Sequence, residues 1–97
     1  MFAFENILQT LKKEKNRLIQ EYSIQSLALF GSYSRNEQTL DSDIDIMVEL
    51  GTDHLGLRFI DLAEDLEKIL EHKVDLVSKD AIKPRYWVEI EQDIKYV

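Results

Sequence analysis

Apolar residues recur at helical spacing in two segments of this sequence. In residues 4–21 and again in residues 57–71, they form one stripe, and charged or polar residues fill the other positions. An apolar stripe of this period predicts an amphipathic helix that packs on a core. Pro84 stands where a last helix, to about Glu91, would begin, since proline is favoured in a first helical turn. We therefore predict three helices.

Shorter apolar stretches have the pattern of β-strands. Residues 24–30 form an apolar run that ends at Gly31, where glycine permits a bend in the backbone. Apolar and polar residues alternate over 42–50, which predicts a strand with one buried face. A third short strand is predicted over 73–77, and a terminal one over 94–97.

The predicted order is helix, strand, strand, helix, strand, helix, with a short helical turn in the polar segment 32–39. A small sheet covered by helices is the natural packing for this order, so the expected fold class is α/β or α+β. The chain has 97 residues, of which 44% are hydrophobic and 32% charged. That size and composition predict one domain over residues 1–97 with one core.

Charge and cysteine content narrow the possible functions. Twelve Lys and Arg residues against 19 Asp and Glu residues give a net charge of −7, which argues against binding a nucleic-acid backbone or an anionic membrane. The chain has no cysteine, so disulfides, thiolate metal sites and a Cys nucleophile are excluded. The first residues lack the pattern of a signal peptide, and no apolar run reaches membrane-spanning length. A cytoplasmic location is therefore expected.

The chemistry predicted from this sequence begins with Asp43 and Asp45. They stand two residues apart on the predicted strand 42–50, so both carboxylates leave the same face. Two close carboxylates repel each other unless cations neutralise them. Oxygen ligands without a nearby His or Cys suit Mg²⁺, which takes one or two carboxylates together with water and substrate phosphates. The pair therefore predicts a magnesium site, and two ions on shared carboxylates would suit phosphoryl chemistry.

Phosphate donors are predicted just upstream, where Gly31 and Ser32 follow the strand 24–30. Glycine lets a substrate approach the backbone, and the amides that follow, with the Ser32 hydroxyl, can donate to phosphate oxygens. Arg35 adds a cation that can hold phosphate. This segment is not a P-loop, because the P-loop spacing and its Gly-Lys-Ser/Thr ending are absent. Asp75, inside the apolar strand 73–77, is a third candidate: it would be a metal ligand or a general base if that strand neighbours the Asp43/Asp45 strand.

These residues resemble a known signature. Gly31-Ser32, ten intervening residues and Asp43-Ile44-Asp45 resemble the polymerase β nucleotidyltransferase superfamily. The short chain and the Val74-Asp75-Leu76-Val77 strand are similar to its minimal nucleotidyltransferase (MNT) branch. The family often has Arg-Gly where this chain has Arg35-Asn36, a turn that asparagine tolerates.

The resemblance implies a small mixed β-sheet backed by helices, ATP as nucleotide donor and Mg²⁺ as metal. It implies Asp43, Asp45 and Asp75 as catalytic carboxylates and metal ligands, and Gly31 and Ser32 as phosphate contacts. Many members of the branch are antitoxins paired with a HEPN-domain toxin, and some transfer AMP from ATP to a tyrosine hydroxyl of that toxin. The resemblance thus predicts a Mg²⁺-dependent nucleotidyltransferase that acts on a HEPN toxin and can form a hetero-oligomer with it.

Two other functions stay open. The chain could neutralise a toxin by complex formation without catalysis, or transfer AMP to a small-molecule hydroxyl such as that of an aminoglycoside. Structural roles also stay open for the candidate residues: a solvated strand face for Asp43 and Asp45, a strand-end position for Asp75, an ordinary turn for Gly31-Ser32, and a surface ion pair with Glu37 for Arg35.

Several neighbouring residues have simpler expectations. Tyr33 has two interpretations: a partly exposed loop aromatic, or a group that stacks on a base. We expect surface positions for two histidines, packing or contact with a partner for two aromatic residues, and a solvated helix face for three acidic residues. These are, in the same order, His54 and His72; Tyr86 and Trp87; Glu64, Asp65 and Glu67.

Overall fold

Helices and strands form where the hydrophobic pattern predicts them. The computed structural model describes residues 4–35, 37–39, 41–51 and 55–97. In chain order its elements are α1 (Phe4–Tyr22), β1 (Ile24–Phe30), α2 (Gly31–Ser34), β2 (Ile44–Leu50), α3 (Arg58–Leu70), β3 (Val74–Ser78), the 3₁₀ helix η1 (Lys79–Ala81), α4 (Pro84–Asp93) and β4 (Lys95–Tyr96). The sequence pattern does not predict η1, because a single 3₁₀ turn is too short to show an apolar period.

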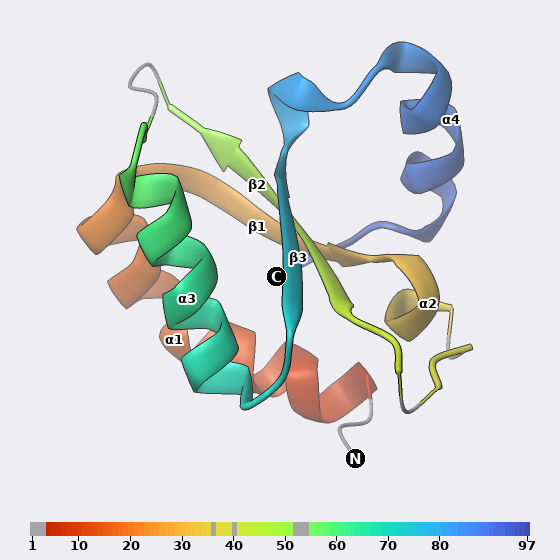
Figure 1. Ribbon diagram of the computed structural model, residues 1–97, viewed down its shortest axis with the longest axis horizontal. Helices are drawn as coiled ribbons and strands as arrows, with labels where there is room; N and C mark the ends of the chain where they lie inside the picture. The colour runs from red at the N-terminus through yellow and green to blue at the C-terminus, as the bar shows by residue number, and fades with distance from the viewer. Residues whose placement is uncertain (1–3, 36, 40, 52–54) are drawn as a thin grey trace.

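The strands form one mixed sheet in the order β3-β2-β1-β4 (Figure 1). β1 pairs antiparallel with both β2 and β4, whereas β2 and β3 are parallel. Parallel neighbours need a long crossover, and α3 supplies it between β2 and β3. This arrangement confirms the small mixed sheet that the resemblance implied.

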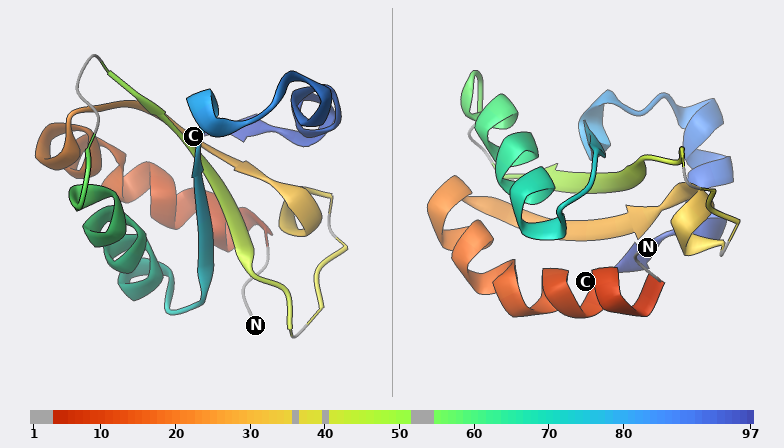
Figure 2. Two further views of the ribbon diagram at one scale, coloured as in Figure 1. Left: turned by 45° about the horizontal axis from the view of Figure 1, so that its top comes forward. Right: turned by 60° about the horizontal axis from the view of Figure 1, so that its bottom comes forward.

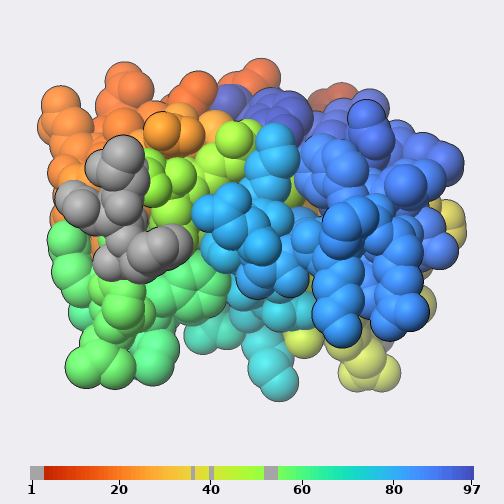
Figure 3. Space-filling model, turned by 90° about the horizontal axis from the view of Figure 1, so that it is seen from above, coloured from red at the N-terminus to blue at the C-terminus, as the bar shows by residue number. Residues whose placement is uncertain are grey.

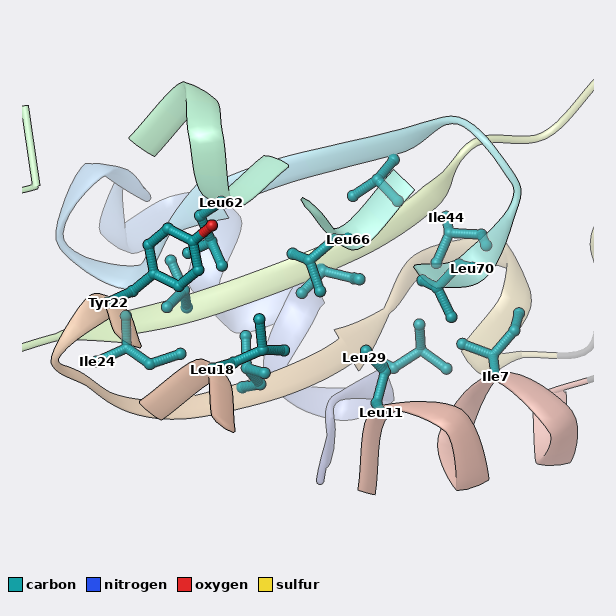
Figure 4. Packing of buried hydrophobic residues seen from close by; sticks show 14 of the residues in the cluster. Ile7, Leu11, Leu18, Tyr22, Ile24, Leu29, Ile44, Leu62, Leu66 and Leu70 are labelled. Carbon is teal, nitrogen blue, oxygen red and sulfur yellow. The ribbon is translucent and has the colours of Figure 1, made fainter. Parts of the chain in front are cut away.

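The hydrophobic core lies between the sheet and two helices. α1 and α3 pack side by side on one face of the sheet (Figures 1 and 2), and their apolar stripes meet the inward residues of β1 and β2 (Figure 4). Fully buried members of this cluster include Ile7, Leu11, Leu18, Leu27, Leu29, Ile44, Ile46, Leu62 and Leu66. At about 25 cal/mol per Å² of apolar surface, this burial is the main favourable contribution to folding.

The alternation of side chains along β2 separates the core from the site. Ile44, Ile46 and Val48 enter the core beneath α1 and α3, so Asp45 and Met47 face the opposite side of the sheet. η1 and α4 lie on that opposite side (Figure 2), and they form much of the surface in the space-filling view (Figure 3). The carboxylates of the predicted site therefore emerge on the side of the sheet away from the main core.

Acidic side chains of α3 do more than face solvent, which corrects the sequence expectation for two of them. Asp65 accepts hydrogen bonds from the Tyr22 hydroxyl at 2.9 Å and from the Arg17 guanidinium at 3.0 Å. The Arg17 hydrogen bond lowers the pKa of Asp65. Glu67 accepts the backbone N–H of Val74 at 2.9 Å. Asp65 thus joins α3 to α1, and Glu67 joins it to the start of β3.

Packing of the α4 aromatics differs from the expectation for one residue. Tyr86 is 50% exposed, so the expectation that it packs within the fold is wrong, and contact with a partner stays a prediction. Trp87 is partly buried, and the ammonium of Lys79 lies 5.0 Å from its ring centroid. Among the helices of the described residues, none has the length and apolar character needed to cross a membrane.

Candidate active site

Gly31, in the turn after β1, lies against Asp45 of β2. Gly31 begins α2 with φ of +76°, in the left-handed region that favours glycine. A Cβ atom at this position would lie 2.1 Å from the Oδ2 atom of Asp45. The absence of a side chain therefore serves both the bend and the close approach of the carboxylate. Two motifs that are 14 residues apart in the sequence (31 and 45) are in contact.

Asp45 and Asp75 face each other across the parallel pair of β2 and β3. Their Cα atoms are register partners, which confirms that the two candidate strands are neighbours. Adjacent strands are about 4.8 Å apart, so carboxylates that share a face at one register position lie close together. Asp75 is exposed, whereas Asp45 and Asp43 are partly buried. A reacting group from solvent can therefore reach the Asp75 side of the pair.

The electrostatics of this cluster favour a cation. Burial raises the pKa of Asp45 to about 6, and the negative charges of Asp75 and Asp43 add to the shift, while Arg35 opposes it. A carboxyl group perturbed by burial and like charges is common at functional sites, and a bound cation would relieve both effects. Among the residues that the structure describes, no three His, Asp or Glu side chains form a group able to hold a metal ion by themselves. The three-carboxylate metal site therefore stays a prediction.

A stability measurement can test the pKa of Asp45. The pKa of Asp45 in the folded state lies above its ordinary value of 3.8, so the folded protein binds a proton at Asp45 more tightly than the unfolded protein does. The stability of the fold therefore falls as the pH rises from about 4 to about 6. Without divalent cations, Asp45→Asn should raise the free energy of unfolding at pH 7 by about 1 kcal/mol, a figure discounted for the half-exposed side chain. Urea unfolding at pH 7 and pH 4 in a chelator measures this.

The comparison between the two pH values is the decisive part of that measurement. At pH 4 the carboxyl is mostly protonated in the folded state, so the difference between wild type and Asp45→Asn should be smaller than at pH 7. An identical difference at both pH values would contradict a raised pKa at this position.

Arg35 lies beside the turn but is engaged by two carboxylates. Its Nε donates to Glu37 at 3.2 Å and its Nη1 donates to Asp93 at 2.9 Å. The Glu37 contact is the surface ion pair that the sequence left open as an alternative. The hydrogen bond with Asp93 raises the pKa of Arg35 further above its already high value. Contact between Arg35 and phosphate stays a prediction, and it would compete with these ion pairs.

A cavity of about 160 Å³ lies next to the turn, where α4 approaches it. Its lining residues are Phe30, Gly31, Arg35, Glu89, Ile90 and Asp93. The Ser34 hydroxyl also donates to the backbone carbonyl of Asp93, so α2 and α4 are joined at two points. No pattern in the sequence singles out Glu89 or Asp93, because nothing in the residues of α4 indicates which element the helix approaches.

The structure agrees only in part with the sequence predictions for the residues around the turn. Tyr33 is buried, with 1% of its side chain exposed, so neither a stacking role nor an exposed loop position is correct. His72 is partly buried and contacts Tyr33, so it is only in part the surface residue that the sequence predicts. His54 lies outside the described residues. Ser32 is partly buried in α2, and its carbonyl accepts the N–H of Glu37 at 2.8 Å. Its contact with phosphate stays a prediction.

Comparison with known proteins identifies the family. The nucleotidyltransferase domain family matches residues 11–97. The chain belongs to this family. A relative from Methanocaldococcus jannaschii, named as a candidate protein adenylyltransferase, is 46% identical over 98 residues that cover 100% of both chains. The protein adenylyltransferase MntA of Thermococcus cleftensis is 35% identical over 97 residues, which cover 100% of this chain and 98% of that protein.

Solved structures of family members share the fold. A candidate minimal nucleotidyltransferase superposes with a TM-score of 0.81 at 26% identity, over 97% of this chain and 95% of that chain. A toxin–antitoxin structure with AMP-PNP superposes with a TM-score of 0.71 at 28% identity, over 88% of this chain and 70% of that chain. The Shewanella oneidensis complex of a tri-AMPylated HEPN toxin with an MNT antitoxin superposes with a TM-score of 0.65 at 26% identity, over 91% of this chain and 69% of that chain. The minimal nucleotidyltransferase fold implied by the sequence is confirmed.

Proposed function

We propose that this chain is a Mg²⁺-dependent nucleotidyltransferase that moves AMP from ATP to a hydroxyl of a HEPN-class toxin and so acts as its antitoxin. The observation that carries the proposal is the Asp45 carboxylate, which lies against Gly31 and opposite Asp75. The turn that we propose to bind phosphate therefore lies next to the carboxylates that we propose to bind metal. The MntA relative and the AMPylated toxin complex support the choice of AMP and of a protein acceptor.

The carboxylate cluster suits a hard divalent ion that arrives with its substrate. The three candidate ligands are all carboxylates, and burial together with the negative charges of Asp75 and Asp43 raises the pKa of Asp45, which a bound cation would offset. Asp43 and Asp45, with Asp75, would hold Mg²⁺, and triphosphate oxygens would complete its ligands. Bound there, Mg²⁺ would neutralise the triphosphate and polarise the α-phosphate. The proposal includes two ions, as in other sites where carboxylates bridge metals.

Each residue then has a role in an in-line displacement. The Gly31 backbone and Ser32 hold phosphate oxygens, and Arg35 adds positive charge beside them. The acceptor hydroxyl oxygen bonds to the α-phosphorus of ATP, the bond from that phosphorus to the bridging oxygen breaks, and pyrophosphate leaves. Asp75 is the proposed base that takes the hydroxyl proton, because it is the exposed member of the pair. Positioning and charge neutralisation supply most of the catalysis.

The proposal also specifies the acceptor of AMP, the complex that reacts and the domain organisation of the chain. Asp75 is open to solvent, so a hydroxyl carried by a partner protein can approach the site from outside. We propose a tyrosine as the acceptor, a hetero-oligomer with the toxin as the reacting complex, and residues 1–97 as one domain. The cytoplasmic location expected from the sequence remains a prediction.

One labelling experiment tests the proposed function. The chain is incubated with ATP labelled at the α-phosphate, Mg²⁺ and the product of the neighbouring gene as the candidate toxin, and that product is analysed by gel and by mass spectrometry. We expect label on the toxin and a mass increase equal to one or more AMP groups, at a tyrosine. ATP labelled at the γ-phosphate is the matched control, because AMP transfer releases that label as pyrophosphate.

The other outcomes separate the alternatives. A stable complex that inhibits the toxin without any label would support neutralisation by binding and contradict transfer. Label on an added aminoglycoside, and none on the toxin, would assign a small-molecule acceptor. Omission of Mg²⁺ with excess chelator should abolish labelling, and undiminished transfer under that condition would contradict the metal requirement.

A further inference from the structure

A partly buried hydrogen-bonded connection joins the three motifs of the proposed site at one end of the sheet. The Tyr33 hydroxyl lies 3.3 Å from His72 Nε2, and the two rings pack edge to face with centroids 5.8 Å apart. His72 Nδ1 lies 3.0 Å from the carbonyl oxygen of Lys73. That same oxygen accepts the backbone N–H of Ile44 at 3.0 Å. The connection therefore runs from α2 through His72 to the starts of both β3 and β2.

The chemistry of these groups fixes the direction of each hydrogen bond. A carbonyl oxygen can only accept, so His72 Nδ1 must carry the proton that is shared with Lys73. In the neutral imidazole, Nε2 then has a free lone pair and accepts the Tyr33 hydroxyl proton. Both ring nitrogens are thereby satisfied, and the ring has one defined tautomer and one defined orientation.

Each end of this connection lies next to a proposed functional residue. Tyr33 directly follows Ser32 in the four-residue α2, so a fixed Tyr33 ring also fixes the turn that begins at Gly31. Ile44 stands between Asp43 and Asp45, and Lys73 is two residues before Asp75. Glu67 also accepts the N–H of His72 through its carbonyl, at 3.3 Å, which holds the histidine against the end of α3.

We infer that His72 is a positioning residue for nucleotide transfer: through Tyr33 it holds the phosphate turn in register with the carboxylates of β2 and β3. This inference rests on the proposed function. His72 itself touches none of the reacting atoms, and its effect is transmitted through the Tyr33 hydroxyl and the Lys73 carbonyl. Because the turn is only four residues long, this side-chain link adds an attachment to the body of the fold beyond its backbone connection to β1.

Tyr33→Phe tests the inference with a minimal change. The variant keeps the buried ring and removes only the hydroxyl, so the turn loses its link to His72 while the core stays filled. We expect the KM for ATP in the toxin-labelling reaction to rise about fivefold, the effect of losing one hydrogen bond of about 1 kcal/mol, with a smaller change in kcat. Binding of AMP-PNP should weaken by a similar factor.

Tyr22→Phe is the matched control. Tyr22 is also a buried tyrosine, and its hydroxyl donates to Asp65 at 2.9 Å between α1 and α3, away from the site. Both variants lose one hydroxyl from a buried ring, so a general loss of stability would affect them alike. Only Tyr33→Phe should raise KM. Equal KM values for Tyr33→Phe, Tyr22→Phe and the wild type would overturn the inference.

A double-mutant cycle shows whether Tyr33 acts through His72. His72→Phe should raise KM as Tyr33→Phe does, and the Tyr33→Phe change should have little further effect in the His72→Phe background. His72→Gln places an amide near the position of Nε2 and should restore part of the wild-type KM. Additive effects of the two Phe variants would overturn the coupling.

A spectroscopic measurement on the unaltered chain completes the test. Long-range ¹H–¹⁵N spectra distinguish the two imidazole tautomers, and we expect His72 with its proton on Nδ1. The Nε2 resonance should shift in Tyr33→Phe and stay unchanged in Tyr22→Phe. A proton on Nε2 would overturn the inference. Absence of toxin labelling by the wild type would instead overturn the proposed function, and the inference with it.

Discussion

Replacement of Asp45 by Asn is expected to reduce AMP transfer by on the order of 100- to 1,000-fold, the usual cost of removing one group that neutralises charge in a transition state. Asn keeps the size of the side chain, so it still fits against Gly31. It loses the negative charge that, with Asp43 and Asp75, would attract a divalent cation. The rate of toxin labelling at saturating ATP and Mg²⁺ measures the loss.

Stability separates this result from simple unfolding. Because Asp45 has a raised pKa, Asp45→Asn should be at least as stable as the wild type at pH 7 without metal. Glu64→Gln is the control: it removes one negative charge at an exposed position of α3, on the other side of the sheet, and should leave labelling unchanged. Wild-type rates in a folded Asp45→Asn protein would contradict the assigned carboxylate role.

Gly31→Ala is expected to reduce both stability and activity. Alanine pays about 1–2 kcal/mol for a left-handed backbone conformation, and its methyl group would overlap the Asp45 carboxylate. Asp45 must therefore move, or the turn must open. We expect a loss of about 2 kcal/mol or more in the free energy of unfolding. Transfer should also fall on the order of 100-fold, because a displacement of about 1 Å at a reacting centre has an effect of this size. Urea unfolding and the labelling assay measure the two losses.

Gly56→Ala is the matched control for the cost of placing alanine in a left-handed backbone conformation. Gly56 also has a positive φ, of +59°, but a Cβ atom there would meet nothing within 4 Å. Gly56→Ala should therefore lose about 1 kcal/mol of stability and no activity. The excess loss in Gly31→Ala measures the contact with Asp45. If both variants lost the same stability and kept full activity, the close approach of Asp45 to Gly31 would have no functional consequence.

The local sequence pattern predicts part of the carboxylate arrangement, and the tertiary structure determines the rest. The alternation of residues 42–50 places Asp43 and Asp45 on one strand face, and the structure confirms for Asp45 that this is the face away from the main core. Which strand lies beside them is a non-local property. The parallel pairing that makes Asp45 the partner of Asp75 depends on how α3 crosses the sheet, and no periodicity in the sequence encodes that register.

Arg35 and Tyr33 are residues whose contacts depend on the tertiary structure and not on the local sequence. Residue type alone suggested Arg35 as a phosphate ligand or a partner of Glu37, and Tyr33 as a loop aromatic or a group that stacks on a base. In the fold, Arg35 pairs with Asp93, 58 residues away, and Tyr33 is buried with its hydroxyl at His72, 39 residues away. Neither partner is visible in a local window, because each comes from an element that tertiary packing brings to the turn.

The sequence by itself determined the elements of this protein, its fold class, the glycine at the turn and the acidic pair on one strand. All of these follow from short-range rules: the periods of helices and strands, the backbone freedom of glycine and a motif with fixed spacing. Only the tertiary structure decided that Asp45 presses against Gly31, that Asp75 faces it, and that His72 connects the three segments. These are contacts between distant parts of the chain, and they depend on strand order and register, which the burial of the whole core selects.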